Sequence, residues 1–332
     1  MLNNRTIVRK NDGFSLFWDL TVGNVTPSPS WLERKNRLKF MLRTLFYFRS
    51  SIQYLNEISN LKNIEGILSN QPSLPIKIHR PYLTKNFPMS SRITTIVNHY
   101  KICEEILPPE MFDLYTVGDS VNLYKCDDPE SHSFSIDLLS IDNLNKEGEM
   151  TILLRDFDGE PLAKLTFSFI KIDNELCFFV GGIQGTKLDG SYDRIKNITK
   201  ACHGTFPKKM LIESLVFLGK QLEIKNILMA GNKSHIYNNW RYRKRLKFMH
   251  ADYDELWQSI GATEKADVYT TPCFIPRKSL SDIPSKKRSE YRKRFQLLDS
   301  IEEAIALHFE KDGNDQREQG GTCYSLYDKH EA

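Results

Sequence analysis

The eight uncharged residues Leu176–Ile183 constrain the fold of this chain more than any other segment. A near-continuous apolar run of this length, bounded by turn residues, is typical of a strand that is buried on both faces of a sheet. Leu162–Ile172 precedes it and alternates apolar with polar residues, and the turn Ile172-Asp173-Asn174-Glu175 separates the two segments. The sequence therefore predicts two paired strands here, the second of which is buried.

Further segments extend this pattern on both sides. Short strands are predicted at Val121–Tyr124, Phe134–Leu139 and Thr151–Leu154. A polar connection containing Gly185, Gly190 and Gly204 follows the buried strand, and a connection that long is usually functional or partly helical. Pro207 suits the first turn of a helix, and Ile227–Ala230 reads as the next buried strand. Later helices are predicted at Tyr253–Ile260 and Arg288–His308.

The N-terminal third has a different, helical pattern. Residues 1–30 read as an irregular lead-in that ends among Pro27 and Pro29, and Trp31–Leu68 and Arg92–Leu107 show helical spacing of apolar residues. We therefore predict an α+β protein, with a helical region at 31–110 packed on a mixed, mostly antiparallel sheet with packed helices at 111–309. The polar segment 310–332 is predicted to be a flexible tail.

Composition excludes several classes of protein. The chain has 332 residues, 27% of them charged, and a net charge of +4, which does not fit wholesale disorder or a dedicated nucleic-acid binder. Six scattered cysteines without a CxxC pair argue against a zinc site, so we predict reduced thiols and no metal. The sequence shows no signal-peptide apolar region and no membrane-spanning run, which predicts a cytoplasmic protein, with the periplasm the less expected alternative.

The start of the helix at Pro207 has features of an anion-binding site. A helix N-terminus offers unpaired N–H groups and a partial positive charge. Gly204 would let a ligand approach the backbone, while Lys208 and Lys209 would add charge. The alternative is that both lysines are only solvated residues of the first turn.

A histidine follows the strand at Ile227–Ala230, where α/β sheets commonly keep their sites. His235 is a candidate general base, with Tyr237 or Glu213 as its partner. The alternative is an ordinary hydrogen-bonding histidine in a loop. Ser234 is not part of a Gly-x-Ser-x-Gly motif, so a hydrolase nucleophile is not predicted.

Three clusters of basic residues could meet nucleic acid, anionic lipid head groups or an acidic partner, and the alternative is that they are solvated helix faces. The first is Arg34, Lys35, Arg37 and Lys39 on the first predicted helix. Aromatic residues are interleaved among the charges. The predicted basic surface comprises Arg241, Arg243, Lys244, Arg245, Lys286, Lys287 and Arg288.

Several of these segments, taken in order, resemble the VirK/YbjX family of enterobacterial proteins over roughly residues 35–305. The resemblance is carried by Val180-Gly181-Gly182-Ile183-Gln184-Gly185, Pro207-Lys208-Lys209-Met210-Leu211, Ser234-His235-Ile236-Tyr237, Tyr253-Asp254-Glu255-Leu256-Trp257 and Ile283-Pro284-Ser285-Lys286-Lys287-Arg288-Ser289-Glu290-Tyr291-Arg292.

This resemblance implies a virulence-associated accessory role at the bacterial cell envelope. The expected role is in correct expression or surface localisation of an outer-membrane virulence protein, possibly post-transcriptional, and in tolerance of antimicrobial peptides. The expected partner is that protein or its biogenesis pathway. The family supplies no agreed catalytic residues.

A second resemblance is architectural. Antiparallel strands followed by a helix and another strand are similar to the core of GNAT-type acyltransferases, whose strand-to-helix turn binds the pyrophosphate of an acyl carrier through Gln/Arg-x-x-Gly-x-Gly/Ala. Here Gln184-Gly185 is followed by an insertion, so the motif is interrupted. The resemblance implies acyl-CoA or another acyl carrier as cofactor, with Gln184, Gly185, Gly204, Lys208 and Lys209 around it.

Three hypotheses follow. The protein is a non-catalytic or chaperone-like accessory, a GNAT-like acyl or group transferase that modifies an envelope component, or an RNA-binding regulator that uses the basic surface. Loss of the envelope phenotype in Lys208→Ala or His235→Ala variants would favour the enzyme, whereas salt-sensitive RNA retention would favour the regulator.

Overall fold

The computed structural model describes residues 8–126, 133–186, 191–242 and 252–310, and an eight-stranded sheet runs through them. The strand order is β1-β2-β3-β4-β5-β6-β8-β7. Neighbouring strands are antiparallel except β5 and β6, which run parallel. The strands are β1 Val121–Cys126, β2 Phe134–Leu139, β3 Met150–Asp156, β4 Pro161–Ile172, β5 Glu175–Gly185, β6 Asn226–Ala230, β7 Thr263–Lys265 and β8 Val268–Pro272.

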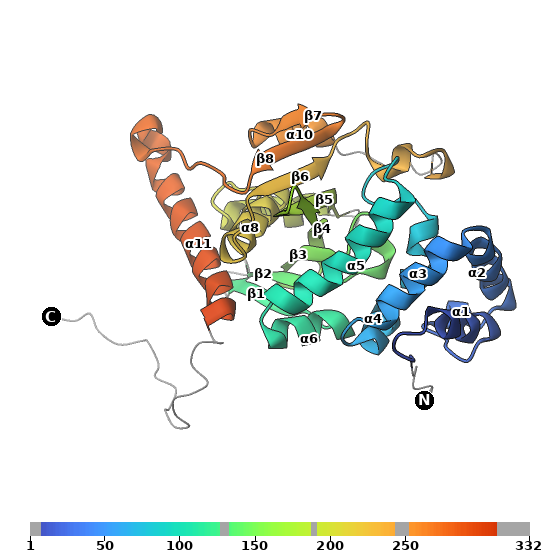
Figure 1. Cartoon of the computed structure of the whole chain (residues 1–332). Helices are drawn as coiled ribbons and strands as arrows, with labels where there is room; N and C mark the ends of the chain where they lie inside the picture. Colours follow the sequence, from blue (N-terminus) through green and yellow to red (C-terminus); the bar gives the residue numbers. More distant parts are fainter. Residues whose placement is uncertain (1–7, 127–132, 187–190, 243–251, 311–332) are drawn as a thin grey trace, which may run out of the picture.

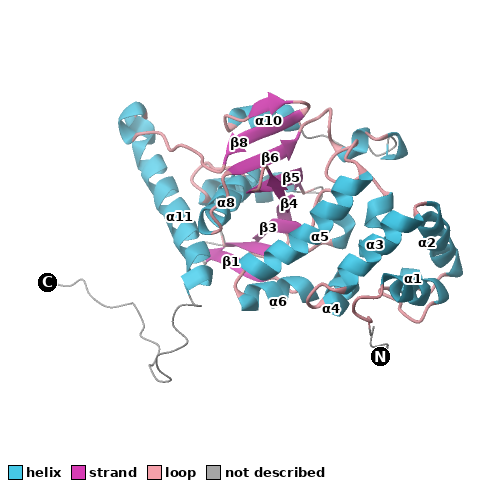
Figure 2. Ribbon diagram, in the orientation of Figure 1, coloured by secondary structure: helices cyan, strands magenta, loops and turns pink. Residues whose placement is uncertain are grey.

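Helices cover the sheet from two sides. The helices α5 (Met89–Ile106) and α8 (Pro207–Gln221) both pack on β4, and α11 (Ser285–Glu310) packs on α8 and β1. Figure 1 shows α8 and α11 on one side of the strands, and α5 with the N-terminal helices on the other. Figure 2 shows the same arrangement by type of element. Coverage from both sides explains why most residues of β3, β4 and β5 are buried.

The remaining helices are short and mostly N-terminal. They are α1 Gly13–Val22, α2 Arg34–Phe46, α3 Phe48–Ser59, α4 Ile64–Asn70, α6 Pro109–Val117, α7 Ser191–Ala201 and α10 Tyr253–Ser259. Single 3-10 turns are η1 Pro29–Trp31, η2 Leu74–His79, η3 Asp142–Leu144, η4 Ile236–Asn238, η5 Trp240–Tyr242 and η6 Leu280–Asp282.

The predicted α+β class, with a helical N-terminal region and a mostly antiparallel sheet, is confirmed. Leu176–Ile183 lies inside β5, between β4 and β6, and Phe178, Phe179 and Val180 are buried. The five cysteines among the described residues form no disulfide with one another. The predicted tail at 310–332 lies outside the described residues from 311 onward.

The prediction that residues 1–30 are irregular is wrong, because α1 forms within them. The Asp12 carboxylate accepts the Ser15 N–H at 2.7 Å and caps the helix start. Gly23 ends the helix at φ 95°, a left-handed conformation that glycine adopts readily. Leu16, Phe17 and Leu20 form its buried face. The prolines at 27 and 29 lie beyond this end and do not interfere with the helix.

Other boundaries also differ from the prediction. The predicted helix at 31–68 is three helices, α2, α3 and α4, with non-helical backbone at Tyr47 between the first two. The polar connection after β5 contains α7, in accord with a partly helical connection. The strands β7 and β8 and the helix α6 are not in the prediction. The three residues of β7 are too few to show an alternation, and the nine of α6 fall short of the about 11–18 residues over which helical periodicity is read.

A buried polar network joins the N-terminal helices to the sheet. Lys77 in η2 and Glu149 before β3 form an ion pair, with Nζ 2.5 Å from Oε2, and both side chains are almost fully buried. The Tyr100 hydroxyl of α5 donates to the same carboxylate at 2.8 Å. The Tyr115 hydroxyl donates to the Glu149 carbonyl at 3.1 Å. The helical region is therefore fixed on the sheet by specific polar contacts as well as by apolar packing.

Candidate functional site

The strands β5 and β6 are paired for only part of their length. Their pairing ends at Val180 and Met229, while β5 continues to Gly185. On its other side, β5 carries a bulge: Thr166 lies opposite Gly182 and Phe167 opposite Val180, which leaves Gly181 as the extra residue. Beyond Val180, the edge of β5 that faces β6 is therefore free of strand partners, so other groups can reach it.

Glu147, in the connection between β2 and β3, lies against this part of β5. A Cβ atom built on Gly181 would lie 2.0 Å from the Glu147 carbonyl oxygen, and one built on Gly182 would lie 2.2 Å from Oε2 of its carboxylate. Only glycine at both positions leaves room for this approach. The two glycines thus place a carboxylate, which is only 2% exposed, directly on the bulged strand.

Polar side chains surround the Glu147 carboxylate. The Gln184 Nε2 amide donates to its two oxygens at 2.9 and 2.8 Å. The Tyr237 side chain forms a further hydrogen bond with it. The His235 Nε2 atom lies 3.9 Å from Oε1, too far for a hydrogen bond. The carboxylate is therefore held in one orientation by Gln184 and Tyr237 and faces His235.

The environment of Glu147 shifts its titration towards neutral pH. Burial raises the pKa of this carboxyl to about 7, although the hydrogen bonds from Gln184 and Tyr237 and the charge of Lys146 oppose the rise. An acid with a pKa near 7 is half ionised at physiological pH, so it can both take up and release a proton there.

His235 is fully buried and neutral at physiological pH. Burial lowers the pKa of its imidazole to about 4. Its Nδ1 accepts the Tyr237 backbone N–H at 3.3 Å, so the proton of the neutral ring lies on Nε2. The ring stacks on Tyr253, with 4.9 Å between centroids. Among the described residues Nε2 has no hydrogen-bond partner, so this N–H can donate to a ligand atom held near Glu147.

The loop that carries His235 is fixed at several points. The Gly231 N–H donates to Ser234 Oγ at 2.9 Å, and the His235 N–H donates to the Gly231 carbonyl at 2.9 Å. The Lys85 N–H donates to the Ser234 carbonyl, which ties the loop to the segment before α5. Trp257 of α10 donates to the Ala230 carbonyl at 2.9 Å. His235 is thus held by several parts of the chain.

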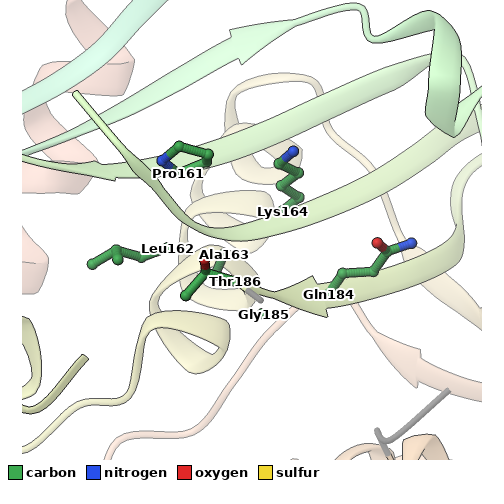
Figure 3. A pocket seen from close by; sticks show the side chains of 7 residues that line it. All are labelled: Pro161, Leu162, Ala163, Lys164, Gln184, Gly185 and Thr186. Carbon is green, nitrogen blue, oxygen red and sulfur yellow. The ribbon is translucent and has the colours of Figure 1, made fainter. Parts of the chain in front are cut away.

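A pocket opens beside Gln184. Its volume is ≈ 320 Å³, and it lies where β4 and β5 pair at Lys164 and Gln184 (Figure 3). Since Gln184 lines this pocket and also holds Glu147, the pocket and the carboxylate are neighbours. The lining residues are Pro161, Leu162, Ala163, Lys164, Gln184, Gly185 and Thr186.

The residues of the predicted anion site lie in two places. The Lys208 side chain passes Gly185, whose built Cβ would lie 3.7 Å from Lys208 Cε, and burial lowers the pKa of this lysine. Gly204 has φ 79°, and a Cβ atom there would lie 2.6 Å from Glu290 Oε1 of α11. Arg294 Nη2 lies 2.8 Å from the same built atom and pairs with Glu290, so an internal ion pair occupies the space beside Gly204. Gln184, Gly185 and Lys208 form the other part of the predicted site.

The predicted catalytic residues also lie on different elements. His235 and Tyr237 lie together around Glu147. Glu213 lies on α8, where burial raises its pKa and the charges of Lys209 and Arg277 oppose the rise. Sequence reasoning missed Glu147 because it follows no motif. The only signal was the glycine pair of the bulge, which requires a close neighbour without naming it.

The predicted basic surface is partly involved in internal contacts. Arg241 donates to the His79 carbonyl at 2.9 Å, and Arg288 donates to the Ile283 carbonyl at 2.9 Å. Lys286 and Lys287 are exposed at the start of α11. Arg243, Lys244 and Arg245 lie outside the described residues.

The opposite pKa shifts of Glu147 and His235 give a testable pH dependence of stability. The Glu147 carboxyl has a raised pKa, so its stabilising contribution is full below pH 4.5 and is lost as pH rises to about 7. His235 has a lowered pKa, so its contribution is full above pH 6.5 and is lost as pH falls to about 4. In the wild type these two dependences largely cancel.

Single substitutions should separate them. Relative to the wild type, Glu147→Gln should gain about 3 kcal/mol in the free energy of unfolding as pH rises from 4 to 8. His235→Gln should gain a similar amount as pH falls over the same range. Urea unfolding at several pH values measures both. Differences from the wild type that do not change with pH would contradict the shifted pKa values.

Comparison with known proteins places the chain among bacterial relatives. A family model described as "Protein of unknown function (DUF535)" matches residues 29–307. The Escherichia coli K12 "Uncharacterized protein YbjX" is 37% identical over 296 residues, which cover 89% of this chain and 90% of that protein. A Haemophilus influenzae "Uncharacterized protein" is 28% identical over 220 residues, covering 66% of this chain and 72% of that one.

A more distant relative carries a descriptive name. "Membrane protein LapB" of Mannheimia haemolytica is 23% identical over 200 residues, covering 59% of this chain and 83% of that protein. In the present chain, none of the helices within the described ranges combines the length and the apolarity needed to cross a membrane.

Proposed function

The chain belongs to the VirK/YbjX family, which matches the DUF535 model, and we propose that it is a GNAT-like group transferase that moves an acyl group from an acyl carrier to an envelope component. The observation that carries this proposal is the buried Glu147 carboxylate, with a pKa of about 7, facing the unpartnered Nε2–H of His235. A base near neutrality opposite a hydrogen-bond donor is the pair that acyl transfer needs.

The strand arrangement supports the GNAT-like assignment. Antiparallel strands lead to β5, the helices α7 and α8 follow, and β6 then runs parallel to β5. In GNAT-type enzymes the turn after the corresponding strand binds the carrier's pyrophosphate. Here Gln184 and Gly185 end β5, the side chain of Lys208 from the first turn of α8 reaches Gly185, and Lys164 lines the adjoining pocket. The two lysines suit a negatively charged carrier.

The side chains would divide the chemistry as follows. An acyl carrier supplies an activated carbonyl carbon. Glu147 takes the proton from the amine or hydroxyl of the acceptor, which makes that group nucleophilic. His235 Nε2–H donates to the carbonyl oxygen as negative charge develops on it. As the acceptor's bond to the acyl carbon forms, the C–S bond to the carrier breaks, and the leaving thiolate takes the proton from Glu147, which restores the carboxylate. Gln184 and Tyr237 keep the carboxylate oriented throughout, and burial excludes water from the reacting groups.

The family resemblance supports the envelope as the location of the acceptor. The resemblance implies roles in placing an outer-membrane virulence protein and in tolerance of antimicrobial peptides. On this proposal, both roles would result from the acylation of an envelope component. The name of the Mannheimia haemolytica relative is in accord with that setting. A non-catalytic accessory role remains the alternative outcome of the tests below.

Turnover of an acyl carrier tests the proposal. Purified protein is mixed with acetyl-CoA or palmitoyl-CoA and amine-bearing envelope lipids, and released thiol is measured. Glu147→Gln should reduce the rate about 100-fold while carrier binding persists, because the variant keeps shape and loses the base. Lys208→Ala should weaken carrier binding about tenfold. Glu264→Gln, the same change on exposed β7, is the control and should leave both unchanged.

Three results would overturn the proposal. One is that neither carrier binds the wild type, measured as a shift in thermal unfolding. Another is that Glu147→Gln keeps the wild-type rate, or that Glu213→Gln abolishes turnover in its place. The last is full restoration of antimicrobial-peptide tolerance by Glu147→Gln in a strain lacking the protein, which would favour the non-catalytic role.

A further inference from the structure

Four arginines gather around His79 without carboxylate partners. Arg92 donates to the Ile78 carbonyl and Arg241 to the His79 carbonyl, both at 2.9 Å. The charges of these two residues, together with those of Arg43 and Arg80, act on the His79 ring. Among the described residues, none of the four forms an ion pair with an acidic side chain. We call Arg43, Arg80, Arg92 and Arg241 the arginine cluster.

The cluster surrounds a buried polar atom that also lacks a partner. The His79 side chain is 7% exposed, and its Nε2 is paired with Ser51 Oγ at 3.0 Å. Its Nδ1 has no hydrogen-bond partner among the described residues. The acid that most affects Arg80 is Asp142, whose carboxylate instead accepts hydrogen bonds from Ser73 and Asn145. Converging cations and an unpartnered buried nitrogen are the features of an anion site.

Part of this arrangement lies away from solvent, since His79 is buried and Arg80 and Arg92 are half-buried. Burial and the charges of the surrounding arginines lower the pKa of His79 to about 4, so the ring stays neutral. Burial also lowers the pKa of Arg80; Tyr242 and Asp142 oppose this shift, whereas Arg43 and Arg241 add to it. Like charges in a partly desolvated place repel each other strongly. A bound anion with several oxygens would relieve that repulsion and pair with more than one guanidinium group.

The surface beside the arginine cluster carries exposed apolar and aromatic side chains among positively charged ones. Tyr47 stacks on His79, with 6.1 Å between centroids, and Trp240 lies against Arg241 and is 81% exposed. Tyr47 directly follows α2, whose Leu38, Leu42 and Leu45 are exposed at helical spacing. On α1, Phe14, Trp18 and Val22 are exposed at the same spacing.

Charge identifies the kind of partner that this surface fits. From residue 31 to 50 the chain has six arginines or lysines and a single acidic residue, Glu33. Exposed leucine and aromatic side chains among cations are typical of helices that lie in the head-group region of an anionic bilayer. A neutral or cationic protein partner would leave these charges unmatched.

We propose that the arginine cluster binds the phosphate of an anionic lipid head group while the exposed apolar faces of α1 and α2 enter the lipid layer. The ligand class is a phosphorylated amphiphile, and the protein lies on the membrane surface without crossing it.

The position of Tyr242 between the arginine cluster and Glu147 indicates a class of acceptor for the proposed transferase. Lys146 Nζ lies 5.6 Å above the Tyr242 ring, and that ring is 6.3 Å from the Tyr237 ring. Tyr242 also acts electrostatically on Arg80 and Arg92. Tyr242 thus connects the arginine cluster to Glu147. A lipid held by the cluster is the candidate acceptor, and this step alone rests on the proposed function.

Vesicle co-sedimentation of the full chain tests lipid binding without any acyl carrier. The wild type should bind vesicles of phosphatidylcholine with phosphatidic acid and should not bind phosphatidylcholine alone. Arg80→Gln/Arg241→Gln should lose about tenfold or more in affinity. Lys286→Gln/Lys287→Gln removes the same charge from the exposed start of α11 and should lose less than about twofold. Leu42→Ser, an exposed position that does not disturb the core, should also weaken binding.

Each other outcome has a defined meaning. Equal losses in the two double variants, or equal binding to both kinds of vesicle, would overturn the proposal. So would stabilisation of the wild type by inorganic phosphate with no retention on vesicles, since the ligand would then be a free phosphate. Retained binding by Arg241→Gln and Leu42→Ser, with unchanged thermal unfolding, would equally overturn it. Failure here leaves thiol release unaffected, so the two proposals fail separately.

Discussion

Replacing Lys77 with methionine should lower the free energy of unfolding by about 3–5 kcal/mol. The substitution removes the cation and leaves the Glu149 carboxylate in the interior, where the Tyr100 hydroxyl still donates to it. Its second oxygen, Oε1, has no partner among the described residues even in the intact protein. Urea unfolding at neutral pH measures the loss.

Two variants make this prediction specific. Lys77→Met/Glu149→Gln removes both charges, so it should recover most of the stability lost in the single variant. Lys101→Met breaks an ion pair with Glu57 on the surface, where the two side chains are 52% and 38% exposed. That change should cost no more than about 1 kcal/mol. Similar losses from Lys77→Met and Lys101→Met would contradict the role assigned to the buried pair.

Replacing Gly181 with alanine should lower the free energy of unfolding by about 3–4 kcal/mol. The new methyl group would lie 2.0 Å from the carbonyl oxygen and 2.6 Å from the carbonyl carbon of Glu147. Both clashing groups are backbone, so no side chain can move aside, and either the bulge of β5 or the 140–149 connection must shift. Thermal or urea unfolding measures the loss.

Neighbouring glycines supply the controls. At Gly182 the clash is with the Glu147 carboxylate, a side chain that can rotate away. Gly182→Ala should therefore lower the free energy of unfolding less than Gly181→Ala does, but it should reduce transferase activity more, because it displaces the carboxylate. At Gly185 the nearest atom is Lys208 Cε at 3.7 Å, an ordinary contact, so Gly185→Ala should be nearly neutral for stability. If all three substitutions destabilise the protein equally, the close approach of Glu147 is not the reason for the glycine pair.

Much of the fold was predictable because its signals are local. The alternation in Leu162–Ile172 and the apolar run Leu176–Ile183 depend only on adjacent residues, and both segments form strands. The position of His235 after a buried strand likewise pointed to the site. The helix α1 was also local in origin, with its Asp12 cap and Gly23 end, and the prediction failed there because later prolines were given too much weight.

The site itself depends on contacts between distant segments. Glu147 meets Gln184 and His235 only because the sheet brings the β2–β3 connection beside the end of β5 and the loop after β6. Its pKa of about 7 arises from burial by those segments.

The arginine cluster shows the same division between sequence and structure. Arg241 belongs to a run that the sequence identified as basic, whereas its approach to the His79 carbonyl crosses 162 residues of chain. The sequence by itself determined the strands, most helices and the cationic, aromatic character of these segments, because periodicity and charge are properties of neighbouring residues. Only the tertiary structure decided which carboxylate faces His235 and which arginines converge, because burial and desolvation exist only once distant segments have packed together.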